Sequence, residues 1–244
     1  MHPLPLSGKS AVVTGGARRL GRAIALALAD AGADITLTYL ASADDAARTV
    51  ASIQKLGRKA QAVRCDVRDE IQARAAIAAT MAFHGRLDVV VNNAAVFERA
   101  DLASMTVEQW DRIFATNTRG PFLVAREALP HLRASSGRIV NIGSLGGIRP
   151  WADHAHYCAS KAALHMLTQT MAKAFAPEVS VNCVAPGWIA MDDIDTKTAA
   201  HFAAKTPLQR NGSADDVAQA VIYFATNSGF VTGQILAVDG GLGL

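Results

Sequence analysis

Cysteine is scarce in this sequence, with three residues in 244: Cys65, Cys158 and Cys183. Thiols this few and this scattered exclude a disulfide framework and a cysteine-based metal cluster, and they suit a reducing compartment. We therefore expect no metal site, and we expect the three thiols to be buried side chains.

Long apolar runs and blocks of like charge are also missing from the sequence. No window approaches the roughly 18 uninterrupted apolar residues of a membrane span, and residues 1–9 contain no apolar stretch typical of an export signal. The 24 Lys and Arg residues exceed the 21 Asp and Glu residues by a net charge of +3, and the charges are interspersed. Because a nucleic-acid groove needs a concentrated basic patch, we expect a soluble cytoplasmic protein that binds neither nucleic acid nor membranes.

Half of the residues are hydrophobic, which is enough for one sizeable core. Short β-branched runs predict strands at Ser10–Thr14, Asp34–Tyr39, Ala60–Arg64, Leu87–Asn92, Arg138–Ile142, Ser180–Val184 and Ile235–Val238. Helical periodicity predicts helices at Leu20–Ala31, Ala43–Leu56, Asp69–His84, Thr106–Arg133, His154–Phe175 and Ala214–Thr226. This alternation predicts one α/β domain over residues 1–244, a doubly wound Rossmann fold with a mostly seven-stranded parallel sheet flanked by helices on both faces.

A glycine turn joins the first predicted strand to the first predicted helix, in the order Thr14-Gly15-Gly16-Ala17-Arg18-Arg19-Leu20-Gly21. Glycine lets the backbone approach a ligand closely, and the free N–H groups of a helix start favour a pyrophosphate. Arg18, Arg19 and Arg22 add positive charge where the helix dipole disfavours it, and an anionic ligand would reverse that cost. The turn predicts a dinucleotide site; the alternative is a tight turn beside a solvated basic face.

The second predicted strand ends in Tyr39-Leu40-Ala41-Ser42 and lacks the acidic residue expected about 20 residues after the glycine loop. That acidic residue grips the ribose 2′-hydroxyl of NAD(H). Because no carboxylate repels a 2′-phosphate here, and Arg18 and Ser42 can bind one, we expect NADP(H) as the cofactor and NAD(H) as the less favoured one.

A second motif pairs Tyr157 with Lys161, which share one face of a predicted helix, and Ser144 follows the strand before it. A nearby cation favours the phenolate and should lower the pKa of Tyr157 toward the working range. The arrangement predicts proton transfer to a carbonyl oxygen. For the pair alone, a half-buried tyrosine beside a surface lysine is the alternative.

These motifs resemble the short-chain dehydrogenase/reductase family in order and spacing along nearly the whole chain. The further matching residues are Asp66-Val67, Asn92-Asn93-Ala94-Ala95, Asn117, Pro186-Gly187 and Val238-Asp239-Gly240-Gly241. The resemblance implies a hydride-transferring enzyme and gives each matching residue a role.

The resemblance implies that the catalytic residues are Asn117, Ser144, Tyr157 and Lys161. Ser144 would bond the substrate oxygen, Tyr157 would exchange the proton, Lys161 would hold the nicotinamide ribose, and Asn117 would hold a water that links Lys161 to solvent. The predicted cofactor-binding residues are Gly15, Arg18, Arg19, Leu20, Gly21, Tyr39, Ser42, Asp66, Val67, Asn93, Ala94, Tyr157, Lys161, Pro186, Gly187 and Ile189. Purely structural roles are the alternatives: caps for Ser144 and Asp66, and the satisfaction of backbone groups for Asn117.

The sequence also departs from the common family pattern. Arg19 stands where most members have glycine, and both Arg19 and Phe97 resemble the pteridine reductase branch, where the phenylalanine stacks on a flat pterin. Ser144 replaces the aspartate usual in that branch and suits a ketone, whereas Met191 replaces the threonine usual in 3-oxoacyl reductases. We expect NADPH-dependent reduction of a ketone or 3-oxoacyl carbonyl, with pteridine reductase as the alternative and a non-catalytic NADP(H)-binding sensor as the remote one.

The substrate is expected under a helical, polar lid near residues 188–208, against walls formed by Phe97, His154 and Trp188. For His154, a solvated or capping role is the alternative. The long predicted helices at 106–133 and 154–175 resemble those through which family members associate, so we expect a homo-oligomer, either a dimer or a tetramer. The expected partners are a small carbonyl or pterin substrate and further copies of the chain.

Overall fold

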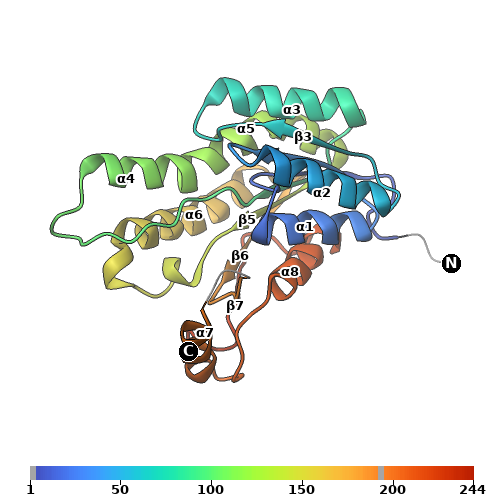
Figure 1. Cartoon of the computed structure of the whole chain (residues 1–244). Helices are drawn as coiled ribbons and strands as arrows, with labels where there is room; N and C mark the ends of the chain where they lie inside the picture. Colours follow the sequence, from blue (N-terminus) through green and yellow to red (C-terminus); the bar gives the residue numbers. More distant parts are fainter. Residues whose placement is uncertain (1–3, 192–194) are drawn as a thin grey trace.

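A computed structural model describes residues 4–191 and 195–244 of the chain. Its strands are β1 (Ser10–Val13), β2 (Asp34–Tyr39), β3 (Ala60–Arg64), β4 (Val89–Asn92), β5 (Arg138–Ile142), β6 (Ser180–Pro186) and β7 (Ile235–Val238). Its α-helices are α1 (Arg19–Asp30), α2 (Ala43–Lys55), α3 (Glu70–His84), α4 (Val107–Phe114), α5 (Gly120–Ser135), α6 (Ala155–Ala174), α7 (Thr196–Lys205) and α8 (Ala214–Thr226) (Figure 1).

The seven strands form one parallel sheet in the order β3-β2-β1-β4-β5-β6-β7. The chain runs outward from β1 to β3 and then returns to place β4 on the other side of β1. This reversal confirms the predicted doubly wound fold. Because every strand points the same way, Val13, Asn92, Ile142 and Pro186 end at one edge of the sheet, where ligands of such folds bind.

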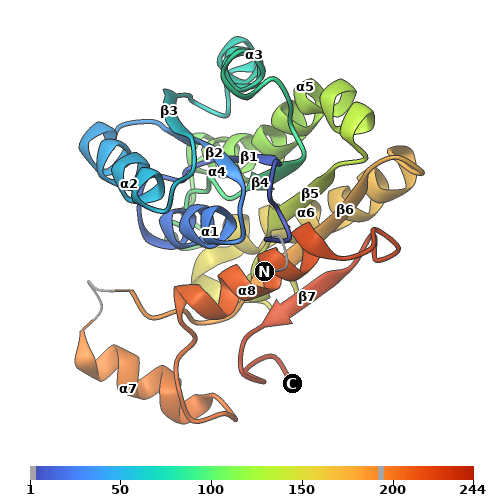
Figure 2. The ribbon, with the colours of Figure 1, turned by 90° about the vertical axis from the view of Figure 1, so that its right-hand side faces the viewer.

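Helices cover both faces of the sheet, as the continuous apolar runs predict. Val89 and Val91 pack into a core with α1, α2 and α8, whereas Val90 packs into a second core with α3, α5 and α6. Figure 2 shows these two helical layers on either side of the strands, with α7 standing apart from both. Alternate residues of one strand therefore serve two different cores.

The long helix predicted over Thr106–Arg133 is wrong in one respect. It is divided into α4, a π-helical turn at Ala115–Arg119, and α5. A π turn holds one extra residue in the turn, and such turns are common at functional sites. Here the turn contains Asn117, which is fully buried and bonded to another loop. The interruption of the helix therefore coincides with tertiary contacts, which helical periodicity cannot predict.

Smaller differences concern element ends and the cysteines. The strand predicted from Leu87 begins at Val89, and the strand predicted to end at Val184 continues to Pro186. Cys65 and Cys183 are buried as expected, but Cys158 is only partly buried. None of the helices in the described ranges is long and apolar enough to cross a membrane.

Candidate active site

The glycine turn lies at the carboxyl end of β1 and is tied to the loop after β4. The side-chain amide of Asn93 donates to the carbonyls of Thr14 (2.9 Å) and Gly15 (3.1 Å), and the Thr14 hydroxyl accepts from the N–H groups of Asn93 and Ala94, both at 3.0 Å. A Cβ on Gly21 would lie 2.2 Å from the Gly15 carbonyl oxygen, so the turn can close only with glycine there. The predicted cofactor residue Asn93 therefore also holds the loop in shape.

Arg19, which replaces the usual glycine, has a left-handed backbone with φ of 52°. A non-glycine residue in this region costs roughly 1–2 kcal/mol. This strained residue lies at the start of α1, next to Arg18, and both residues line the cavity described below. Retained strain of this kind is concentrated at functional positions.

A cavity of about 580 Å³ opens between this turn and the ends of β2, β3 and β4. Eleven of the predicted cofactor residues line it: Gly15, Arg18, Arg19, Leu20, Gly21, Tyr39, Ser42, Asp66, Val67, Asn93 and Ala94. The glycines and arginines in its lining fit a dinucleotide cofactor, whose pyrophosphate is an anion.

Sequence reasoning missed other residues that line this cavity, including Thr38, Arg68, Arg112 and Thr116. Thr38 and Arg68 adjoin predicted residues, so sequence proximity could have found them. Arg112 and Thr116 arrive from the α4 region, and only the fold brings them there.

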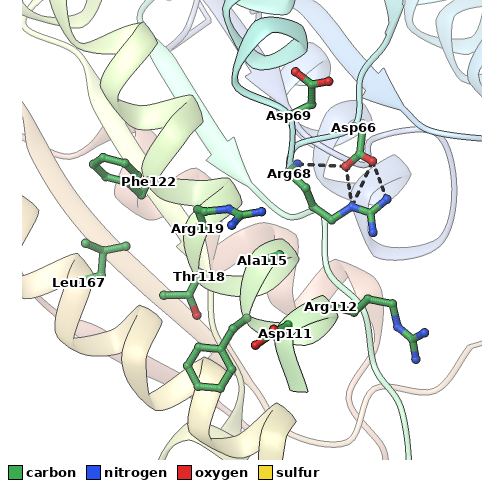
Figure 3. Close-up of a pocket in the computed structure, with 11 residues that line it drawn as sticks. Asp66, Arg68, Asp69, Asp111, Arg112, Ala115, Thr118, Arg119, Phe122 and Leu167 are labelled. Carbon is green, nitrogen blue, oxygen red and sulfur yellow. Dashed lines mark hydrogen bonds and ion pairs between the residues drawn. The ribbon is translucent and has the colours of Figure 1, made fainter. Parts of the chain in front are cut away.

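Asp66, which is predicted to contact the adenine, pairs with Arg68 in the structure. Arg68 donates to both carboxylate oxygens, at 2.9 and 3.0 Å from Nε and 2.6 Å from Nη2, and holds the pKa of Asp66 below its usual range. Both residues also line a neighbouring cavity of about 980 Å³. Figure 3 shows Arg68 folded back onto Asp66, with Phe122 and Leu167 on the far side of this cavity. The adenine contact of Asp66 stays a prediction.

Tyr157 and Ser144 meet at the carboxyl end of β5. Burial raises the pKa of the Tyr157 phenol, and a hydrogen bond with the Ser144 side chain opposes that shift. The Ser144 hydroxyl also accepts from the N–H of Gly146 at 3.0 Å, which is the capping bond expected as its structural alternative. Ser144 therefore both shapes its turn and faces the phenol.

Lys161 does not act on Tyr157 as the spacing predicted. Its Nζ lies 5.8 Å from the centre of the Tyr157 ring and donates to the Ile142 carbonyl at 2.7 Å. The net pKa shift of Tyr157 is upward, because burial outweighs the hydrogen bond with Ser144. The predicted lowering is therefore wrong for this arrangement. Burial also lowers the pKa of Lys161, to about 8.

Asn117 is engaged by protein groups rather than left open to a water. Its Oδ1 accepts from the Val96 N–H at 2.8 Å, and its Nδ2 donates to the Val96 carbonyl at 2.9 Å and to the Ser160 hydroxyl at 3.1 Å. These bonds join the π turn to the loop after β4 and to α6. The predicted water-holding role stays a prediction; the structural alternative is present.

Three aromatic rings gather around the ring of Tyr157. Phe97 is 59% exposed and stacks on His154 at 4.6 Å, while its ring meets Tyr157 edge-on at 4.8 Å. Trp151, which sequence reasoning missed, stacks on Tyr157 at 6.1 Å. We call these rings the aromatic cluster (Phe97, Trp151, His154, Tyr157). The His154 side chain packs in this cluster and makes no capping bond, so the capping alternative is wrong.

The remaining predicted residues follow β6. Gly187 donates its N–H to the Val238 carbonyl at 2.9 Å, and Ile189 pairs with Gly212, so both are fixed to the C-terminal part of the chain. Trp188 stacks on Phe202 of α7 at 3.7 Å, an aromatic contact between the end of β6 and the predicted lid. Within that lid the helix spans only Thr196–Lys205, and residues 192–194 lie outside the described residues.

In the ranges that the structure describes, no three His, Cys, Asp or Glu side chains group as metal ligands would. The reactive groups that the fold gathers at the end of β5 are the Tyr157 phenol, the Ser144 hydroxyl and the Lys161 ammonium group.

Comparisons with known proteins find relatives along nearly the whole chain. A family model described as enoyl-(acyl carrier protein) reductase matches residues 15–243. The chain is 35% identical over 240 residues to the 3-oxoacyl-[acyl-carrier-protein] reductase FabG of Staphylococcus aureus (strain Mu50), covering 96% of this chain and 98% of that protein.

Solved structures match equally well. A dehydrogenase/reductase from Sinorhizobium meliloti 1021 is 39% identical with a TM-score of 0.93, covering 98% of this chain and 97% of that one. A blue fluorescent protein from a metagenomic library, in complex with NADPH, is 36% identical with a TM-score of 0.89, covering 98% of this chain and 99% of that one.

Proposed function

Because the chain belongs to the short-chain dehydrogenase/reductase family, we propose that it uses NADPH to reduce a ketone or 3-oxoacyl carbonyl to a secondary alcohol. The observation that carries this proposal is the pairing of Ser144 with a partly buried Tyr157 at the carboxyl end of β5. The relation to the Staphylococcus aureus reductase supports a 3-oxoacyl substrate.

Two hydroxyl groups prepare the carbonyl. The Ser144 and Tyr157 O–H groups would both donate to its oxygen and stabilise the negative charge that develops there. The bound nicotinamide cofactor supplies the hydride to the carbonyl carbon. Because burial raises the pKa of Tyr157, the phenol keeps its proton until the oxygen becomes an alkoxide, a much stronger base than phenolate.

Lys161 holds its place in the site through the Ile142 carbonyl. Its ammonium group retains two further donors, since it has three, and these would hold the ribose of the cofactor. The preference for NADPH is supported by Arg18, Arg19 and Ser42 in the lining of the cavity, together with the crystal structure of the NADPH-bound neighbour.

Replacing Tyr157 tests this function. In Tyr157→Phe the ring can keep its contacts with Phe97 and Trp151, whereas turnover of acetoacetyl-coenzyme A should fall by roughly 10²–10⁴-fold. Binding of NADPH, followed by its fluorescence, should persist. Tyr223→Phe, at a half-exposed ring on α8, is the matched control, and unchanged turnover in Tyr157→Phe would refute the assignment.

Reduction of a pteridine is the second candidate function. The exposed Phe97 ring beside Tyr157 offers a flat substrate a surface to stack on, and Arg19 stands where the loop resembles that of the pteridine reductase branch. Under NADPH, faster turnover of dihydrobiopterin or dihydrofolate than of acetoacetyl-coenzyme A would make this the function. The hydroxyl of Ser144 in place of a carboxylic acid supports the ketone.

We also propose that the chain associates with itself, as its α4–α6 region suggests. Val107 is 69%, Phe122 41% and Met166 63% exposed on these helices. Apolar side chains exposed together on neighbouring helices are typical of protein contacts. Light scattering that gives the mass of one chain at working concentrations would exclude this association.

A further inference from the structure

His165 is a buried imidazole that the proposed reaction does not use. It lies on α6 one turn beyond Lys161 and two turns beyond Tyr157, so the three share a helix face. Its exposure is 6%. Burial, aided by the positive charge of Lys161, lowers the pKa of His165 to about 4, so the ring is neutral near neutral pH.

The ring contacts the turn that carries Ser144. Its Nε2 accepts from the Ser144 N–H at 3.5 Å, the long end of the hydrogen-bond range. Because a neutral imidazole carries one proton and Nε2 accepts a bond, that proton lies on Nδ1.

The glycines of this turn fit the ring from two sides. A Cβ on Gly143 would lie 2.3 Å from His165 Nε2, and a Cβ on Gly147 would lie 2.6 Å from His165 Cε1. Both distances are too short for a real Cβ contact, so only glycine fits at these two positions without a shift of the ring. The turn from Gly143 to Gly147 is therefore shaped around the imidazole.

We propose that His165 is a positioning residue for the reduction: its neutral ring holds the Gly143–Gly147 turn against α6 and so aims the Ser144 hydroxyl at Tyr157. The proposal rests on the proposed function, since it assigns His165 an effect only through Ser144. Small displacements of catalytic groups are costly, and a shift of about 1 Å can cost roughly 10²-fold in rate.

The variants His165→Leu and His165→Gln separate positioning from packing. Leucine fills similar space without hydrogen bonds, whereas glutamine can still accept at one atom and donate at another. His165→Leu should lower kcat for acetoacetyl-coenzyme A by roughly tenfold or more, with the Kd for NADPH unchanged, and His165→Gln should recover most of the loss. His131→Leu on α5 is the matched control and should change neither constant.

A double-mutant cycle with Ser144→Ala gives the decisive readout. If His165 acts through Ser144, then His165→Leu should have almost no further effect on kcat once the Ser144 hydroxyl is gone. Equal fold-losses in both backgrounds would overturn the proposal. If instead Ser144→Ala and Tyr157→Phe both leave turnover intact, the proposed function itself fails.

The tautomer of His165 supplies a test that needs no variant. Long-range ¹H–¹⁵N spectra of the whole protein should show a neutral imidazole with a protonated Nδ1 and an unprotonated Nε2 for the ring assigned to His165. The opposite tautomer could not accept the Ser144 N–H and would overturn the proposal, even if the leucine variant failed to fold.

Discussion

Asn117 and Val96 share two hydrogen bonds, with the side-chain amide of one residue closing on both backbone groups of the other, at 2.8 and 2.9 Å. Asn117 lies in the π turn between α4 and α5, and Val96 precedes Phe97 in the loop after β4. The Asn117 side chain thus bonds both backbone groups of Val96, as a neighbouring strand would. It connects the aromatic rim of the site to the helix layer behind it.

Replacing Asn117 by alanine should therefore destabilise the protein and impair turnover together. Both backbone groups of Val96, which is partly buried, would lose their partners, at up to about 1–3 kcal/mol for each group. Urea unfolding and kcat measure the two effects. Asn227→Ala, at the exposed end of α8, should cost less stability and leave kcat intact; equal losses in the two variants would contradict the assignment.

Arg19→Gly should separate backbone strain from ligand binding. Glycine relieves the left-handed φ of 52°, so the free energy of unfolding should rise by roughly 0.5–1 kcal/mol. The Kd for NADPH should rise about tenfold, as expected for loss of a charge-assisted bond to phosphate of about 1.4 kcal/mol.

Ser136→Gly provides the control for Arg19→Gly. Ser136 also has a left-handed φ, of 51°, at the end of α5 and away from the cavity. This variant should gain similar stability with no change in NADPH affinity. Unchanged NADPH affinity in Arg19→Gly would remove Arg19 from the cofactor site.

Burial of Lys161 should make stability depend on alkaline pH. Its pKa falls from 10.5 to about 8 on folding, so between these values the unfolded chain binds a proton that the folded chain lacks. Lys161 should therefore add up to about 1.4 kcal/mol of stability per pH unit through this window. Above pH 9 the buried thiols of Cys65 and Cys183 act with the opposite sign, because burial raises their pKa values from 9.0 to about 11 and about 12. Urea unfolding between pH 8 and 9 should show the rise in the wild type and lose it in Lys161→Met.

Lys173→Met controls for that measurement, because Lys173 is exposed on the same helix. It should keep the wild-type slope. A slope that survives in Lys161→Met would assign the pH dependence to another group.

The aromatic cluster should determine preference for aryl substrates. Phe97→Ala and Trp151→Ala should each lower kcat/KM for an aryl ketone such as acetophenone by roughly tenfold, because each removes a ring beside Tyr157. Turnover of 2,3-butanedione, which has no ring to stack, should change less. Phe122→Ala on α5, whose ring lies near Arg126, should affect neither substrate, and equal losses on both substrates would place the cluster outside substrate recognition.

Local and periodic features of the sequence determined the sheet, its helical layers and the cofactor loop. Val89 to Val91 reads as a strand buried on both faces because parallel sheets covered by helices require such runs. The glycine turn and Tyr157 with Lys161 are likewise visible, because each motif is contained within a few residues. The sequence also identified Arg19 as unusual, although not the strain in its backbone.

Only the tertiary structure decided which groups are hydrogen-bond partners of the buried side chains. The partners of Asn117 and His165, at Val96 and at Ser144, lie 21 residues away along the chain in each case, and nothing in their local sequence indicates the pairing. The upward pKa shift of Tyr157 is of the same kind, because desolvation depends on everything packed around the phenol. Motifs near in sequence can be predicted from it, whereas burial and long-range hydrogen bonds follow from the way the sheet and helices pack.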